Sequence, residues 1–80
     1  MELENFLISE NSTILDVLKK IDKMSSFGTR ILFVKDYKGV IKGSISDGDC
    51  RRGLIKGKSL NSLAKEIMNV NFTFVRKQEY

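Results

Sequence analysis

The feature that most limits what this sequence can fold into is its lack of cross-linking residues: the 80-residue chain has one cysteine and no histidine. A domain of this size buries only about 60–65% of the surface that its unfolded chain exposes, so small domains often depend on a disulfide, a metal ion or a further chain. Cys50 has no second cysteine to pair with and no histidine to join it at a zinc ion. We therefore expect the missing burial to come from a second repeat, a partner chain or a ligand.

The absence of histidine also argues against catalysis. Serine and cysteine hydrolases usually activate their nucleophile with an imidazole, which this chain lacks. The N-terminal segment 1–5 is acidic where a signal peptide would be basic, and the longest strictly apolar run, 31–34, is far too short to cross a bilayer. We predict one cytoplasmic domain over residues 1–80 that is not an enzyme, requires no cofactor and has neither a metal site nor a membrane segment.

The charge of the chain is unevenly distributed. Residues 1–30 carry a net charge of −1 and residues 31–80 a net charge of +5, so we expect an anion to bind in the C-terminal two-thirds. A basic helical face there suggests nucleic-acid binding, but no aromatic side chains alternate with its cations, which disfavours nucleic acid as a partner. The residues of that basic face are Arg51, Arg52, Lys56 and Lys58.

Hydrophobic periodicity predicts an α+β fold. Apolar residues recur at helical spacing between 14 and 24, and four consecutive apolar residues at 31–34 predict a strand that is covered on both faces. A turn at 36–39 between two strand-like runs predicts an antiparallel hairpin, and Cys50 and Leu54 face inward in the helix that follows. The predicted strands cover 6–8, 30–35, 40–45 and 71–75, and the predicted helices cover 13–24, 50–56 and 60–68. They form a small mixed sheet packed against two helices, with a short third helix and a C-terminal strand.

The segment 46–52 is the best candidate for a functional site. A strand is predicted to end and a helix to begin there, so free backbone N–H groups and the positive end of the helix dipole favour an anion. Ser46 can donate to a phosphate and Asp49 can accept from ribose hydroxyls, while Arg51 and Arg52 supply positive charge. The same segment also fits a purely structural interpretation, in which Ser46 or Asp47 caps the helix and Asp49 is a first-turn acid.

With this order of elements in view, the chain resembles a CBS domain, the β-α-β-β-α module named after cystathionine β-synthase. The resemblance covers residues 6–75 and is carried by the segments 11–18, 31–36 with Gly39, 43–52 and 67–69. In that family two copies pack sheet against sheet as a Bateman module and bind adenosyl nucleotides in the clefts between them. The resemblance therefore implies a regulatory domain whose ligand is AMP, ADP, ATP or S-adenosylmethionine.

The resemblance also implies roles for individual residues. Asp49 is expected to bind the ribose and Ser46 a phosphate, with Asp47 and Arg51 completing the polar set. Adenine is expected to rest on apolar side chains, with backbone contacts nearby. The implied base and backbone contacts are Ile8, Thr29, Arg30, Ile31 and Ile45.

The chain departs from the family pattern in two respects. Leu32 and Phe33 stand where many members have a proline, and only one copy is present, with a core over 6–68 and the start of a linker or of a truncated second copy over 69–80. A complete cleft then requires a homodimer or a second copy. The segment 46–54 is most similar to CBS domains that precede sugar nucleotidyltransferase domains, such as those like mannose-1-phosphate guanylyltransferase. The sequence thus predicts a module that senses AMP-, ADP- or ATP-type ligands for an attached or partner enzyme, and the alternative is a structural dimerisation module without a ligand.

Overall fold

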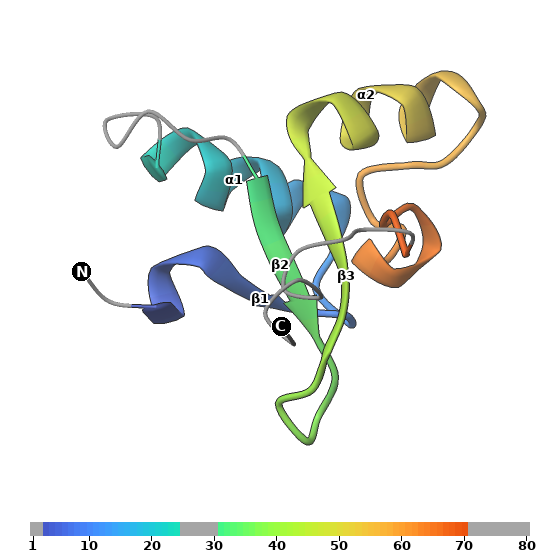
Figure 1. The fold of residues 1–80 in the computed structure, drawn as a ribbon. Helices are drawn as coiled ribbons and strands as arrows, with labels where there is room; N and C mark the ends of the chain where they lie inside the picture. The colour runs from blue at the N-terminus through green and yellow to red at the C-terminus, as the bar shows by residue number, and fades with distance from the viewer. Residues whose placement is uncertain (1–2, 25–30, 71–80) are drawn as a thin grey trace, which may run out of the picture.

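The computed structural model describes residues 3–24 and 31–70. Figure 1 shows the order of the elements, which is η1 (Leu3–Phe6), β1 (Leu7–Ser9), α1 (Ile14–Met24), β2 (Ile31–Lys35), β3 (Ile41–Ser46), α2 (Asp47–Ile55) and η3 (Ala64–Glu66), where η marks a 3-10 helix. The predicted α+β class, a small mixed sheet with two helices, is confirmed. The strand predicted at 71–75 lies outside the described residues, as do Thr29 and Arg30.

The three strands form one sheet in the order β1-β2-β3. Strand β1 runs parallel to β2, because α1 carries the chain back between them, and β3 runs antiparallel to β2 across a tight hairpin. The register sets Ile8 opposite Val34 and Leu32 opposite Ile45. Since side chains alternate along a strand, these four residues share the face of the sheet that packs against the helices.

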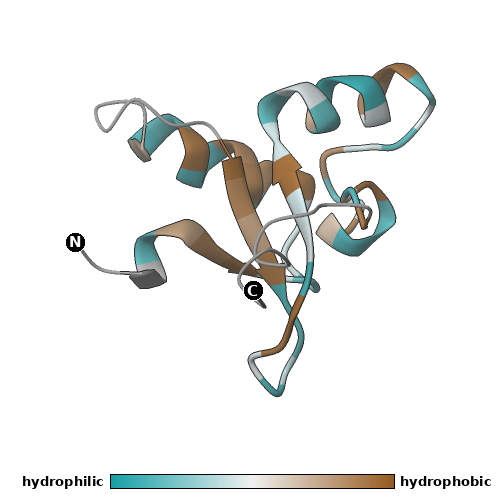
Figure 2. Ribbon diagram, in the orientation of Figure 1, coloured by the Kyte–Doolittle hydropathy of each residue, from teal (hydrophilic) through white to brown (hydrophobic). Residues whose placement is uncertain are grey.

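Helix α1 covers that face with one apolar stripe. Ile14, Val17, Ile21 and Met24 recur at three- and four-residue intervals and are buried, while Lys19 and Lys23 are exposed. Helix α2 adds Cys50 to the same cluster, and Figure 2 shows the hydrophobic segments meeting where the helices approach the sheet. The buried hydrophobic residues are Ile8, Ile14, Val17, Ile21, Met24, Leu32, Val34, Ile45, Cys50 and Ala64.

The prediction that 31–34 is covered on both faces is wrong for the described chain. Leu32 and Val34 are buried, but Phe33 is only partly buried and Ile31 is 40% exposed. Both helices lie on one side of the sheet, so an apolar run without alternation places half of its side chains on the opposite face. Ile31, Phe33 and Leu7 share that face, which we call the open sheet face.

The segment after α2 also differs from its prediction. A helix was expected over 60–68, but only Ala64–Glu66 forms a short 3-10 helix, and Leu63 before it is extended, with φ −87° and ψ 152°. The backbone of 60–64 instead pairs with the start of α1: the N–H of Ile14 donates to the Ser62 carbonyl at 2.8 Å, and the N–H of Ala64 donates to the Ser12 carbonyl at 2.7 Å. The Ile14 bond, together with one from the Leu15 N–H to the Leu60 carbonyl at 3.1 Å, satisfies N–H groups at the start of α1 that have no partner within the helix. This pairing holds 60–63 out of a helical conformation.

No helix within 3–24 and 31–70 combines the length and the apolar character that a membrane span requires.

Candidate functional site

The site predicted at 46–52 lies at the junction of β3 and α2. Strand β3 ends at Ser46 and α2 begins at Asp47, three residues earlier than predicted, because Ser46 is extended (φ −124°, ψ 173°) and caps the helix. The Ser46 Oγ accepts from the Asp49 N–H at 3.2 Å, and the Asp49 Oδ2 accepts from the Ser46 N–H at 2.9 Å. This reciprocal pair is a capping box, so the structure confirms the capping role of Ser46.

The Asp49 carboxylate has a second partner on its other oxygen. Its Oδ1 accepts from the Arg52 guanidinium at 2.7 Å, while Oδ2 also accepts from the Ser46 hydroxyl at 3.1 Å. The Asp49 side chain is 17% exposed, whereas that of Arg52 is 65% exposed. An ion pair with such an exposed cation contributes little to stability. Asp49 is therefore a fixed acceptor whose Oδ1 can exchange its partner without disturbing the cap.

The polar residues predicted to act together are separated by α2 itself. Asp47 and Arg51 are one helical turn apart, and the Arg51 Nη1 lies 3.8 Å from the Asp47 Oδ2. Both residues line a groove between α1 and α2. Asp49 and Arg52 line a different groove, on the side of α2 that faces η3. Since residues three or four apart share a helix face and residues two apart do not, the cation beside Asp49 is Arg52 and not Arg51.

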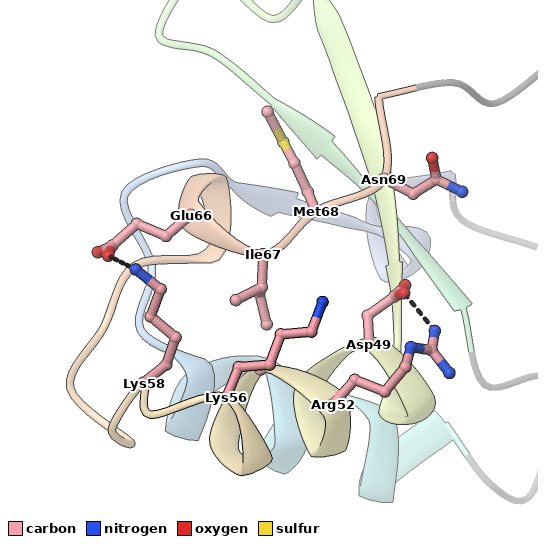
Figure 3. Close-up of a pocket in the computed structure, with 9 residues that line it drawn as sticks. Asp49, Arg52, Lys56, Lys58, Glu66, Ile67, Met68 and Asn69 are labelled. Atoms are coloured by element: carbon pink, nitrogen blue, oxygen red, sulfur yellow. Dashed lines mark hydrogen bonds and ion pairs between the residues drawn. The ribbon is translucent and has the colours of Figure 1, made fainter.

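The second of these grooves, which we call the α2–η3 groove, has a volume of about 360 Å³ (Figure 3). Its apolar wall contains Gly53, where an added Cβ would lie 2.7 Å from the Ile67 Cγ2. The absence of a side chain at Gly53 therefore allows α2 and the segment after η3 to approach closely. Its other lining residues are Asp49, Arg52, Lys56, Lys58, Glu66, Ile67, Met68 and Asn69.

An ion pair closes the far end of the α2–η3 groove. The Lys58 ammonium lies 3.2 Å from a Glu66 carboxylate oxygen, and the other Glu66 oxygen accepts from the Leu63 N–H at 2.9 Å. The Leu63 hydrogen bond, followed by the one from Lys58, holds the pKa of Glu66 below its ordinary value. Sequence analysis assigned Lys56 and Lys58 only to a basic face and missed Glu66, because nothing in the local sequence places η3 against α2.

The residues expected to hold adenine lie in different environments. Ile8 and Ile45 belong to the buried core, and Ile45 is fully buried. Ile31 is 40% exposed on the open sheet face, and it is paired directly with Ser46 at the end of β3. Thr29 and Arg30 lie outside the described residues. Of the implied apolar contacts, Ile31 offers the largest accessible surface.

Cys50 is buried, as the sequence predicted. Its side chain is 0% exposed, and burial, together with the nearby Asp49 and Asp47 carboxylates, raises the pKa of the thiol to about 11. A thiol with such a pKa is a weak nucleophile at neutral pH. Within the described residues, no three Cys, Asp or Glu side chains come together as a metal site would require.

Comparison with known proteins supports the fold. No protein-family model matches the sequence, and no curated protein matches it. Among solved structures, a CBS-domain-containing protein from Agrobacterium tumefaciens superposes with a TM-score of 0.66 at 16% identity, over 81% of this chain and 48% of its own. A CBS-domain protein from Pyrobaculum aerophilum, solved in complex with AMP, gives a TM-score of 0.65 at 17% identity, over 80% of this chain and 48% of its own.

The cytosolic domain of the Mg²⁺ channel MgtE, solved in complex with ATP, gives a TM-score of 0.65 at 26% identity, over 89% of this chain and 27% of its own. The fold of this chain is therefore that of a CBS domain. The described chain corresponds to a single such domain, and it spans about half of the length of the first two structures.

Proposed function

We propose that this chain is a cytoplasmic regulatory module that binds an adenosyl nucleotide at the β3–α2 junction and has no catalytic activity of its own. The observation that carries the proposal is the position of Asp49, a carboxylate that is held by the helix cap and lines a groove. Two structures with the same fold are complexes with AMP and ATP, which supports an adenine nucleotide as the ligand.

In this proposal the helix cap and the ligand share Asp49. Its Oδ2 stays with Ser46, and its Oδ1 exchanges the exposed Arg52 guanidinium for the ribose hydroxyls. A phosphate at the N-terminus of α2, where the helix dipole favours negative charge, takes the Ser46 hydroxyl proton from Asp49 Oδ2, which keeps the hydrogen bond from the Ser46 N–H. Ile31 supplies apolar surface at the same end of the sheet.

The module is proposed to act as one half of a two-copy unit. The open sheet face contains Leu7, Ile31 and Phe33, and a second copy placed against it would complete the cleft, either in a homodimer or in a longer chain. The regulated enzyme would be attached to the module or bound to it, and a sugar nucleotidyltransferase is the candidate that the sequence suggests.

Calorimetric titration with AMP, ADP, ATP and S-adenosylmethionine tests nucleotide binding, and the chain offers a matched control. Helix α1 has the same kind of cap: the Asp16 Oδ2 accepts from the Thr13 N–H at 3.2 Å, and the Thr13 Oγ1 accepts from the Asp16 N–H at 3.1 Å. Asp49→Asn and Asp16→Asn should each lower stability by about 1 kcal/mol. Only Asp49→Asn should weaken nucleotide binding, by about tenfold or more.

The second candidate is a dimerisation module without a ligand, and the apolar open sheet face favours it. It predicts that Ile31→Lys abolishes the dimer in analytical ultracentrifugation, while Val40→Lys, in the hairpin and exposed as well, leaves the dimer intact. It also predicts that no nucleotide binds. Equal nucleotide affinity in the Asp49→Asn and Asp16→Asn proteins would remove Asp49 from the proposed site.

A further inference from the structure

The described chain ends at the outer edge of the sheet, beside β3. The N–H of Ser44 donates to the Asn69 carbonyl at 2.9 Å, and the N–H of Asn69 donates to the Ser44 carbonyl at 2.7 Å, so Asn69 is held at that edge (Figure 3). Ser44 is paired with Phe33 on β2, and Phe33 with Leu7 on β1. These four residues form one row across the sheet, and the described chain ends one residue later, at Val70.

The outer edge of β3 is irregular just beyond that row. The pairing of β3 with β2 passes from Gly43 directly to Ile41, so Lys42 is an extra residue. A bulge of this kind disrupts the ladder locally and twists an edge away from further pairing. Because the bridge between Asn69 and Ser44 is antiparallel, the chain after Asn69 is directed toward Lys42. The edge therefore gives the following segment no regular strand to pair with, whereas the open sheet face begins at the next strand of the same row.

The segment that follows, residues 71–75, has the pattern and the length to cover the open sheet face. One residue separates Phe72 from Phe74, so in an extended chain both rings lie on the same side. Five extended residues span about 16 Å, whereas β1 lies about 10 Å from β3, since neighbouring strands are about 4.8 Å apart. The segment is therefore long enough to cross all three strands.

We infer that residues 71–75 cover the open sheet face of the single chain, with Phe72 and Phe74 against Ile31 and Phe33, and that the segment leaves this face before a second copy docks. The inference rests on the proposed function, which places the second copy there. It adds a regulatory step, because a segment tethered beside the face competes at an effective concentration of about 1 mM. At micromolar protein the tethered segment is favoured over a second copy of similar intrinsic affinity.

Methyl NMR of the 80-residue chain, at a concentration where ultracentrifugation shows a monomer, tests the contact. In the unmodified protein the two aromatic rings shift the methyl resonances of Ile31. Phe72→Ser combined with Phe74→Ser should move these resonances. The matched control is Asn71→Ser combined with Thr73→Ser, which changes the other side of the same segment and should leave them in place.

The same two variants test the competition with a second copy. Both copies must open before they dock, so a cover that is closed in about three-quarters of the molecules raises the dimer dissociation constant about sixteenfold. In sedimentation equilibrium we expect the variant without the two aromatic rings to dimerise about tenfold more tightly than the unmodified chain. The control variant should match the unmodified chain.

The outcomes separate this inference from the proposed function. Unchanged Ile31 resonances in the variant without the rings would overturn the inference, although the nucleotide module stands. Weaker dimerisation of that variant would overturn it as well, because the rings would then belong to the interface between copies. If the Ile31 resonances move but neither protein dimerises at any concentration, the cover is supported and the two-copy unit of the proposed function fails.

Discussion

Replacement of Gly53 by alanine tests the close packing of α2 against the segment after η3. In an exposed helix this change stabilises by about 1 kcal/mol, because glycine loses more backbone entropy on folding. Here the new Cβ would lie 2.7 Å from the Ile67 Cγ2 and 3.5 Å from the Ile67 Cβ. Overpacking of that kind typically costs about 1–3 kcal/mol. We therefore expect Gly53→Ala to destabilise the protein by about 1 kcal/mol, which lowers Tm by about 4–8 °C for a domain of this size.

A double-mutant cycle isolates the cause of that loss. Urea unfolding followed by circular dichroism would be measured for the unmodified protein, Gly53→Ala, Ile67→Ala and the double variant. In the Ile67→Ala background the obstructing methyl group is gone, so the same glycine substitution should stabilise by about 0.5–1 kcal/mol. The reversal of sign is the diagnostic result. Equal destabilisation in both backgrounds would refute the reasoning, because the contact with Ile67 would then not be the cause.

Three further predictions concern single residues elsewhere in the fold. Because burial raises the pKa of Cys50 to about 11, its thiol should react with a disulfide reagent at pH 8 only as fast as the protein unfolds, and a rapid reaction without denaturant would contradict its burial. The Leu63 N–H and Lys58 lower the pKa of Glu66, so the Glu66 carboxylate stabilises the fold above the ordinary glutamate pKa, and this stabilisation is lost as the pH falls through the lowered pKa. The Tm difference between the unmodified protein and Glu66→Gln should therefore shrink on acidification. A Tm difference that stays constant would exclude this origin. Gly39 has φ +85° with open space around it, so Gly39→Ala should destabilise by about 1 kcal/mol through backbone strain alone, measured as a shift in the urea midpoint, and an unchanged midpoint would show that the turn adapts.

Local sequence was sufficient for the elements whose cause is local. The apolar spacing within 14–24 predicted α1 to within a residue of its observed bounds, since one face of a helix needs only that periodicity. The hairpin followed from its turn, where Asp36 Oδ1 accepts from the N–H groups of Lys38 and Val40 at 2.8 and 3.0 Å. Both features arise from residues that are neighbours in the sequence.

Long-range pairing explains where prediction failed. The sequence of 60–68 is compatible with a helix, but its backbone is used by the start of α1, and no local signal reveals that demand. The sequence predicts the start of this helix at 50, and the family resemblance places Asp47 and Asp49 in one polar site. With the helix beginning at Asp47, helical spacing alone assigns them to different grooves. The α2–η3 groove itself depends on η3, which the sequence did not locate.

The pairing of 60–64 with the start of α1 has a consequence for biosynthesis. Carbonyl groups near the end of the described chain accept from N–H groups near its beginning. On the outer edge of β3, the backbone N–H of Ser44 donates to the Asn69 carbonyl, and the N–H of Asn69 donates to the Ser44 carbonyl. During translation residues 60–69 emerge after α1 and the hairpin, whose partner groups are bonded only to water until then. We expect a nascent chain arrested before residue 60 to be sensitive to protease, and one that has released residue 70 from the exit tunnel to be resistant.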